Sequence, residues 1–228
     1  MKQHKRLGSW LGIALGVAAF GAAFDAGAAK PTKDKVSAEA PTLPTAIALT
    51  PAKLAFGQKP LEVGAVYDPV IDADHLKELQ DAQPGVQMDS LLAEIAEKKR
   101  LFRRTLLEFS KINTKWDSTP LATEYTYDNQ EALMVYSRKG KTRYFFFIQN
   151  KLFKVIDELK LGEKSKYGPD FKSAVEVLNK VMGIEGRLRA PDAAAGRPFE
   201  EVDWRDSQTH VRAINWGDGK VGFAYEDN

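Results

Sequence analysis

The chain has 228 residues, with 33 Lys and Arg against 31 Asp and Glu, 43% hydrophobic residues and no cysteine. This is the composition of a soluble globular protein, and it excludes collagenous, mucin-like and multi-span membrane classes. Because cysteine is absent, disulfide frameworks, thiolate zinc sites, iron–sulfur clusters and cysteine nucleophiles are also excluded.

Residues 1–28 have the three-part pattern of a secretory signal peptide. Lys2, Lys5 and Arg6 precede 18 uncharged residues, 7–24. Ala26-Gly27-Ala28 then fits the small-x-small rule for signal peptidase, so we expect cleavage near Ala28 and a periplasmic or secreted protein. The alternative is an uncleaved anchor, since a stretch of this length could just span a bilayer. The leader would then be the only membrane contact.

Cleavage would change the charge balance. It removes three basic residues and Asp25, which leaves 30 basic and 30 acidic residues. A formally neutral protein gives no support for a nucleic-acid partner, and we expect none.

A composition shift divides the rest of the chain. Residues 29–51 are rich in Pro, Thr and Ala, and Pro31, Pro41, Pro44 and Pro51 deny a regular hydrogen-bonded ladder. This predicts a flexible tether over residues 29–51, followed by a single folded domain over residues 52–228.

Helical signals come first in that domain. Pro60 suits the first position of a short helix. Asp72 or Asp74 can cap a second helical piece, which Pro84-Gly85 ends. A longer helix is expected from Asp89 to Phe109, because its apolar residues recur at helical spacing.

Strand signals follow. Segments 124–127, 132–136, 144–148 and 152–156 are rich in aromatic and β-branched residues, with turns at 138–141 and 149–151. Tyr144–Ile148 is apolar on both faces, which predicts a central strand.

The last third predicts one helix and three strands. The helix should begin after Gly168-Pro169 and end at Gly183. Residues 185–199 are expected to form a surface loop, and strands are expected at 201–205, 209–215 and 221–225. This order favours an α+β fold, an antiparallel β-sheet with helices packed on one face.

Three short stretches resemble bacterial envelope proteins. Phe56-Gly57-x-x-Pro60-x-Glu62-Val63 is similar to a turn-helix piece in the small lipoproteins of the outer-membrane β-barrel assembly machine. With Trp204-Arg205-Asp206 and Phe223-Ala224-Tyr225, the chain as a whole looks more like a group of uncharacterised exported bacterial envelope proteins. The resemblance implies an envelope location and a binding or scaffolding role. It assigns no functional residue, and this chain lacks the lipid-bearing cysteine of the lipoproteins.

Candidate chemistry is sparse, because His75 and His210 are the only histidines after residue 28. Asp203, Asp206 and His210 could bind a divalent cation, but a hairpin with local turn hydrogen bonds is the simpler interpretation. Ser207 with Asp206 and His210 contains the residue types of a hydrolytic triad, but all three lie within five positions and no G-x-S-x-G motif is present. We therefore expect no metal, no cofactor and no enzymatic activity.

Two possible binding surfaces remain. One basic cluster could dock on anionic lipid or acidic cell-wall polymer, or could simply be the polar face of an amphipathic helix; it comprises Lys98, Lys99, Arg100, Arg103 and Arg104. Trp204 and Trp216, with Phe223 and Tyr225, could line an aromatic groove or belong to the core.

The leading hypothesis is thus a non-enzymatic envelope protein that binds another, unidentified protein or assists assembly. One alternative is a cell-wall or carbohydrate-acting or -binding protein, with Trp204, Trp216 and Asp203 around a groove. The other is a periplasmic lipid carrier, which an enclosed apolar cavity would favour.

Overall fold

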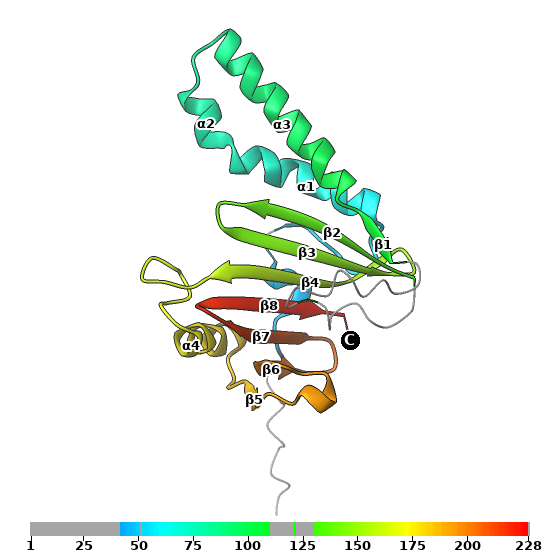
Figure 1. Ribbon diagram of the computed structural model, residues 1–228, viewed down its shortest axis with the longest axis vertical. Helices are drawn as coiled ribbons and strands as arrows, with labels where there is room; N and C mark the ends of the chain where they lie inside the picture. The colour runs from blue at the N-terminus through cyan, green and yellow to red at the C-terminus, as the bar shows by residue number, and fades with distance from the viewer. Residues whose placement is uncertain (1–41, 51, 110–120, 122–129, 228) are drawn as a thin grey trace, which may run out of the picture. The chain divides into compact units, whose positions relative to one another are not determined.

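Eight antiparallel strands pair into one sheet in the order β1-β2-β3-β4-β8-β7-β6-β5 (Figure 1). The structure is a computed structural model, and it describes residues 42–50, 52–109, 121 and 130–227. Helices pack on one face of the sheet, so the expected α+β fold is confirmed.

The strands are β1 (Leu107–Phe109), β2 (Glu131–Arg138), β3 (Lys141–Ile148), β4 (Lys151–Lys160), β5 (Arg187–Arg189), β6 (Glu200–Arg205), β7 (His210–Gly217) and β8 (Lys220–Glu226). The helices are the 3-10 turns η1 (Ala46–Leu49) and η4 (Ala193–Ala195) and the α-helices α1 (Pro60–Asp74), α2 (Leu76–Asp81), α3 (Val86–Arg104) and α4 (Phe171–Met182). The strand expected at 124–127 lies outside the described residues.

Both expected hairpin turns are confirmed. The β2–β3 turn has φ values of 50° at Lys139 and 75° at Gly140, and the β3–β4 turn has 48° at Gln149 and 65° at Asn150. Two successive positive φ values match the right-handed twist of paired strands, which is why such turns close two-residue hairpins.

Tyr144–Ile148 lies in β3, between β2 and β4, as expected for a central strand. Phe145 and Phe147 point into the core under the helices, and Phe146 joins a second apolar cluster on the opposite face. All three are at most 1% exposed. The strand is therefore apolar throughout because both faces of the sheet are covered here.

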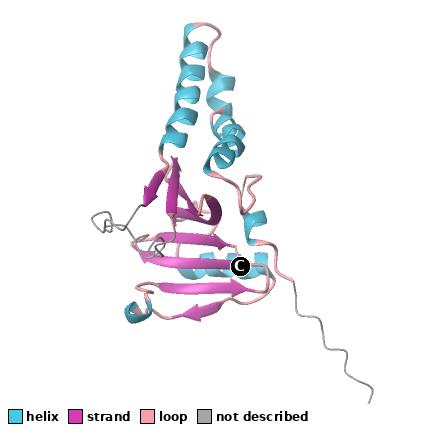
Figure 2. Ribbon diagram, turned by 90° about the vertical axis from the view of Figure 1, so that its right-hand side faces the viewer, coloured by secondary structure: helices cyan, strands magenta, loops and turns pink. Residues whose placement is uncertain are grey.

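Helix α1 begins at Pro60, as expected, and the Glu62 carboxylate accepts a hydrogen bond from the Lys59 N–H at 2.7 Å. It continues through Pro69 to Asp74, so Asp72 and Asp74 do not cap a second helix. Helix α2 instead starts after His75. Figure 2 shows α2 and α3 as neighbouring helices that extend away from the strands.

The long helix differs from its expected bounds, Asp89 to Phe109. Helix α3 begins after Gly85, whose φ of 101° suits glycine, and it ends at Arg104. The Thr105 hydroxyl donates to the Phe102 carbonyl at 2.6 Å and accepts from the Val135 N–H at 2.9 Å. These bonds turn the chain toward the sheet, where Phe109 pairs in β1.

The folded unit also starts earlier than expected, because residues 42–50 are not part of a tether. Leu43 is 4% and Ala46 1% exposed, and both pack in the main core. The Thr209 hydroxyl donates to the Pro44 carbonyl at 3.0 Å. Of the four prolines that suggested a flexible segment, Pro44 thus lies in a stretch that is fastened to the domain, and the other three lie outside the described residues.

Helix α4 is confirmed, with Gly183 in the left-handed conformation at its end. Strands β6, β7 and β8 also follow the prediction. The expected surface loop at 185–199 contains one further element, since Arg187–Arg189 pairs with β6 as the edge strand β5. Its three residues are too few to stand out in a sequence pattern.

Candidate functional site

The basic cluster that could be a docking surface or the polar face of a helix lies on α3 and is largely paired with acids. Arg103 contacts Asp68 of α1 at 2.6 Å, and Lys99 contacts Asp72 at 2.7 Å. Lys98 pairs with Glu94 within α3 at 2.6 Å, and Arg100 pairs with Glu97. Arg104 is exposed. Four of the five charges are therefore paired within α3 or with α1, as in the polar face of an amphipathic helix.

The two tryptophans lie on opposite faces of the sheet. Trp204 is 1% exposed beneath α4, and its indole N–H donates to the Asn179 side chain at 3.0 Å. Trp216 is 9% exposed and packs with Ile156 and Ile214 on the other face. The proposed groove between Trp204, Trp216 and Asp203 is therefore not formed.

The residues Asp203, Asp206 and His210 have separate partners. Arg187 binds the Asp203 carboxylate with two hydrogen bonds of 3.1 Å. The Asp206 carboxylate accepts the N–H groups of Gln208 and Thr209, and these bonds lower its pKa. Within the described ranges, no group of three or more Asp, Glu, His or Cys side chains could hold a metal ion.

His210 instead belongs to a charged network on the sheet face opposite the helices. Its Nδ1 lies 2.6 Å from the Glu226 carboxylate, which Arg212 also contacts at 2.5 Å and Lys154 at 3.5 Å. Burial by itself would raise the pKa of Glu226, but the His210 hydrogen bond and the Arg212 and Lys154 charges lower it well below its usual range. The carboxylate is thus stably ionised, and the network is a structural element of this face.

A different region has the features of a ligand site. Two adjoining cavities of about 340 and 560 Å³ lie beside the β2–β3 turn and the loop that follows β4. This turn and this loop lie at the same end of the strands in Figure 1. We call them the inner and outer pockets of the tyrosine–lysine cleft. The side chains that define the cleft are Tyr67, Tyr136, Tyr167, Tyr225, Arg143, Asp157, Lys139, Lys141, Lys160, Lys164 and Lys166.

Local hydrogen bonds shape the loop that borders the cleft. The Leu161 N–H donates to the Gly219 carbonyl at 2.7 Å, and the Gly168 N–H donates to the Ser165 carbonyl at 3.0 Å. Gly168 has a φ of 86°, and a Cβ there would lie 2.5 Å from the Cβ of Ser173. Only glycine fits this position, so the loop is fixed against the start of α4.

The floor of the inner pocket is a buried polar cluster. Arg143 of β3 holds the Asp157 carboxylate of β4 through two nitrogens, and its third nitrogen donates to the Tyr67 hydroxyl at 2.7 Å. Burial raises the pKa of Tyr67 to about 12, although the Arg143 charge opposes the shift. Arg143 is therefore committed to groups of the protein.

A second polar contact joins the cleft to the helices. The Tyr136 hydroxyl of β2 donates to the Asp74 carboxylate at 2.7 Å, and burial together with this bond raises the pKa of Tyr136. Arg138 binds Glu78 of α2 at 3.1 Å. The second arginine of the cleft is thus also engaged.

Two tyrosine hydroxyls of the cleft have no such partner. Tyr225 of β8 is 3% exposed and lines the inner pocket, and burial raises the pKa of its hydroxyl. Neither the Tyr225 nor the Tyr167 hydroxyl makes a hydrogen bond within the described part of the chain. The Tyr225 side chain is buried and that of Tyr167 is half-buried, and with no partner among the described residues both hydroxyls are available to a bound molecule.

The rim is cationic. Lys141, Lys160 and Lys164 are exposed and make no ion pair among the described residues. Lys139 lies 3.9 Å from Glu78, and the Lys166 ammonium lies 4.6 Å from the ring centre of Tyr167. The sequence patterns considered above did not predict this rim. The signal that could have found it is the run of three lysines within seven residues at 160–166, directly after a strand.

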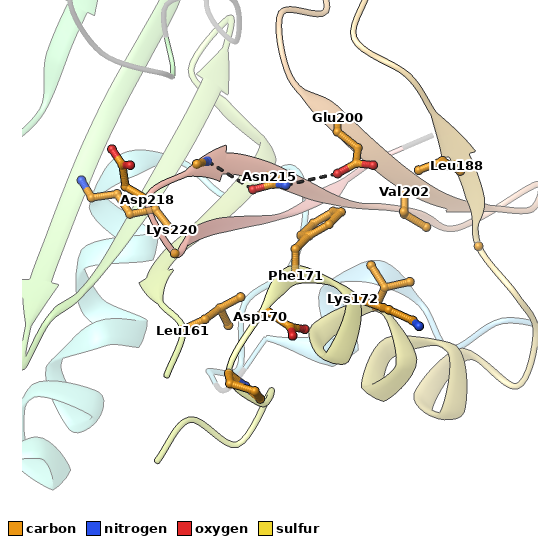
Figure 3. Close-up of a pocket in the computed structure, with 15 residues that line it drawn as sticks. Leu161, Asp170, Phe171, Lys172, Leu188, Glu200, Val202, Asn215, Asp218 and Lys220 are labelled. Carbon is orange, nitrogen blue, oxygen red and sulfur yellow. Dashed lines mark hydrogen bonds between the residues drawn. The ribbon is translucent and has the colours of Figure 1, made fainter. Parts of the chain in front are cut away.

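A third cavity, of about 660 Å³, lies between α4 and the β7–β8 turn (Figure 3). Its walls combine apolar side chains such as Phe171 and Val202 with Glu200 and Asp218. The Asn215 amide donates to Glu200 at 3.1 Å, and its oxygen accepts from the Gly217 N–H at 3.2 Å (Figure 3). These bonds satisfy the polar groups that Asn215 presents there, so this cavity offers fewer free donors than the cleft.

Comparisons with protein-family models, with curated proteins and with solved structures give no match to this chain. Among the described helices, none is both long and apolar enough to cross a membrane.

Proposed function

We propose that this protein is an exported, non-enzymatic binding module of the bacterial envelope and that the tyrosine–lysine cleft is its ligand site. The export part rests on the leader pattern of residues 1–28 and on the expected cleavage near Ala28. The observation that carries the binding part is the side chain of Tyr225, which is 3% exposed and lines the inner pocket, while its hydroxyl has no hydrogen-bond partner among the described residues. A cavity with a few free polar groups is the usual form of a small-molecule site.

The character of the cleft also distinguishes between the alternatives that the sequence leaves open. A lipid carrier needs an apolar interior for acyl chains, whereas charged and phenolic side chains outnumber the aliphatic ones, Leu49, Val70, Leu159 and Leu161, in the lining of this cleft. A carbohydrate groove built on Trp204, Trp216 and Asp203 does not form, because the two indoles lie on opposite faces. The cleft therefore favours a polar ligand held at another place.

The test is native mass spectrometry of the full chain produced in a bacterial host and purified gently from the envelope fraction. We expect a mass that corresponds to cleavage near Ala28 and an additional bound mass. The double variant Lys141→Glu, Lys166→Glu should lose the bound mass, and Lys151→Glu, Lys180→Glu should keep it, because these exposed lysines are not among those that line the cleft.

Three results would contradict the proposal. An uncleaved protein found in the cytosol would contradict the proposed export. If all variants retained the ligand equally, or if the wild-type protein retained no ligand, the cleft would not be the binding site. Chemical conversion of the bound compound during incubation with the protein would show that the protein is an enzyme.

A further inference from the structure

We infer that the ligand of the tyrosine–lysine cleft carries two or more phosphate groups. This inference rests on the proposed function and adds the chemical class of the ligand. It follows from which cationic groups of the cleft are free, and from how the two pockets connect.

The charge of the cleft is strongly unbalanced. Its two pockets are lined by seven basic and three acidic residues, namely Arg138, Lys139, Lys141, Arg143, Lys160, Lys164 and Lys166 against Asp74, Asp157 and Glu158. Glu158 is engaged elsewhere, since it accepts from the Tyr144 hydroxyl at 2.8 Å and pairs with Lys220 at 3.2 Å. Crowded like charges in a concave site raise the local potential, which an anionic ligand relieves.

The free cations are ammonium groups. Arg143 is bound to Asp157 and Arg138 to Glu78, so neither guanidinium has its pair of parallel N–H donors free for a ligand carboxylate. A lysine ammonium is a compact point charge that binds phosphate without needing planar, two-point geometry. A phosphate also has enough oxygens to accept the hydroxyls of Tyr167 and Tyr225 as well as ammonium groups.

The arrangement of the pockets calls for more than one anionic group. The inner and outer pockets share Lys139, Lys141 and Lys166, whereas Lys160 and Lys164 line only the outer one. A ligand with one phosphate near the Tyr225 hydroxyl would leave Lys160 and Lys164 without a counter-charge. A second phosphate in the outer pocket completes the charge balance.

Phosphates of this kind occur on soluble compounds and on lipid headgroups, and one experiment separates the two sources. Calorimetry of the full chain with inorganic phosphate, pyrophosphate and tripolyphosphate tests soluble ligands. Sedimentation with phosphatidylcholine vesicles, with and without cardiolipin, tests a headgroup that carries two phosphates. We expect binding to strengthen from phosphate to tripolyphosphate and to weaken as salt is added.

The deciding comparison uses two triple variants that remove the same number of charges. Lys141→Gln, Lys160→Gln, Lys164→Gln removes the unpaired rim lysines, and Lys77→Gln, Lys151→Gln, Lys180→Gln removes exposed lysines outside the cleft. The variant without the rim lysines should bind about tenfold or more weakly, because each charged hydrogen bond to the ligand contributes a sizeable part of that factor. The variant without the lysines outside the cleft should bind less than about twofold more weakly. Tyr225→Phe, which removes only the hydroxyl, should also weaken binding.

The outcomes are distinct. Loss of pyrophosphate binding in the cleft variant assigns a soluble ligand, and loss of cardiolipin-vesicle binding alone assigns a lipid headgroup. No binding by the wild type to any of these probes, or equal effects of the two triple variants, overturns the phosphate inference. If native mass spectrometry still finds a cleft-dependent ligand without phosphorus, the proposed function stands and only this inference fails.

Discussion

The backbone N–H of Leu43 donates to the carboxylate of Asp206 at 3.1 Å, across 163 positions of the chain. This bond fastens the segment before α1 to the β6–β7 turn. The same turn orients Asp206 through its bonds to Gln208 and Thr209. Residues 42–50, which composition assigned to a tether, are therefore part of the folded unit.

Removal of that segment should be costly. A chain that begins at Pro51 lacks the buried side chains of Leu43 and Ala46. Because burial of a leucine side chain alone contributes about 1.5 to 3 kcal/mol, we expect the free energy of unfolding to fall by about 3 kcal/mol or more. Urea unfolding measures this. A chain that begins at Pro41 is the control and should match the full mature protein. Equal stability of the two shortened chains would refute the packing of residues 42–50.

Phe145 and Phe146 test the two faces of the sheet separately. Each is at most 1% exposed, on opposite faces, so replacement by alanine should cost about 3 to 5 kcal/mol in either case. Denaturant unfolding of Phe145→Ala and Phe146→Ala measures both values. A loss below about 2 kcal/mol for Phe146→Ala would mean that the second face is not a closed core.

Arg103 and Arg104 provide the contrast on α3. Arg103 pairs with Asp68, but the Arg103 side chain is 34% exposed. Ion pairs that are this accessible to solvent contribute little to the free energy of unfolding. The double variant Arg103→Gln, Arg104→Gln should change the unfolding free energy by less than about 1 kcal/mol. A larger loss in the same unfolding assay would make the α1–α3 ion pairs a main source of helix stability.

Glu226 should make stability depend on pH. The pKa of Glu226 in the folded protein is lowered from the ordinary 4.5. Its contribution to the free energy of unfolding is therefore complete above about pH 5 and is lost as the pH falls and the carboxylate takes up a proton. Glu226→Gln should cost about 3 kcal/mol near neutral pH, because the neighbouring cations lose the carboxylate they share. The difference from wild type should shrink below about pH 4.

Unfolding curves across this pH range measure the effect. Glu176→Gln, an exposed carboxylate on α4, is the control and should show little change at any pH. A Glu226→Gln difference that stays constant from neutral to acidic pH would contradict an ionised network.

Gly186 tests how closely the sheet edge approaches the core. A Cβ there would lie 2.4 Å from Val202 and 2.5 Å from the Trp204 ring, so Gly186→Ala should destabilise the protein by about 1 to 3 kcal/mol. Gly162→Ala is the matched control, because nothing lies within 4 Å of its added Cβ. Thermal unfolding of the two variants measures the difference, and similar midpoints would show that the chain before β5 can move away.

Local patterns were sufficient for much of the fold. The two hairpin turns at 138–141 and 149–151, the central strand Tyr144–Ile148 and the helix closed by Gly183 follow from residues adjacent in the chain, since turn conformation and side-chain alternation are local properties. The same patterns misplaced the end of α3, because the Thr105 bond to Val135 joins segments 30 positions apart.

The candidate site depended on the tertiary structure. Tyr67, Tyr136, Tyr167 and Tyr225 come from a helix, a strand, a loop and the last strand, and no spacing in the chain indicates that they meet. The pairing of β4 with β8 brings Tyr225 beside Val155, and that pairing joins segments 70 positions apart. The sequence by itself predicted the export pattern and most of the helices and strands in their order, but it missed the short edge strands β1 and β5. Only the packing of distant segments decided which lysines are free and which hydroxyls face a cavity, because ion pairing and burial are properties of neighbours in space.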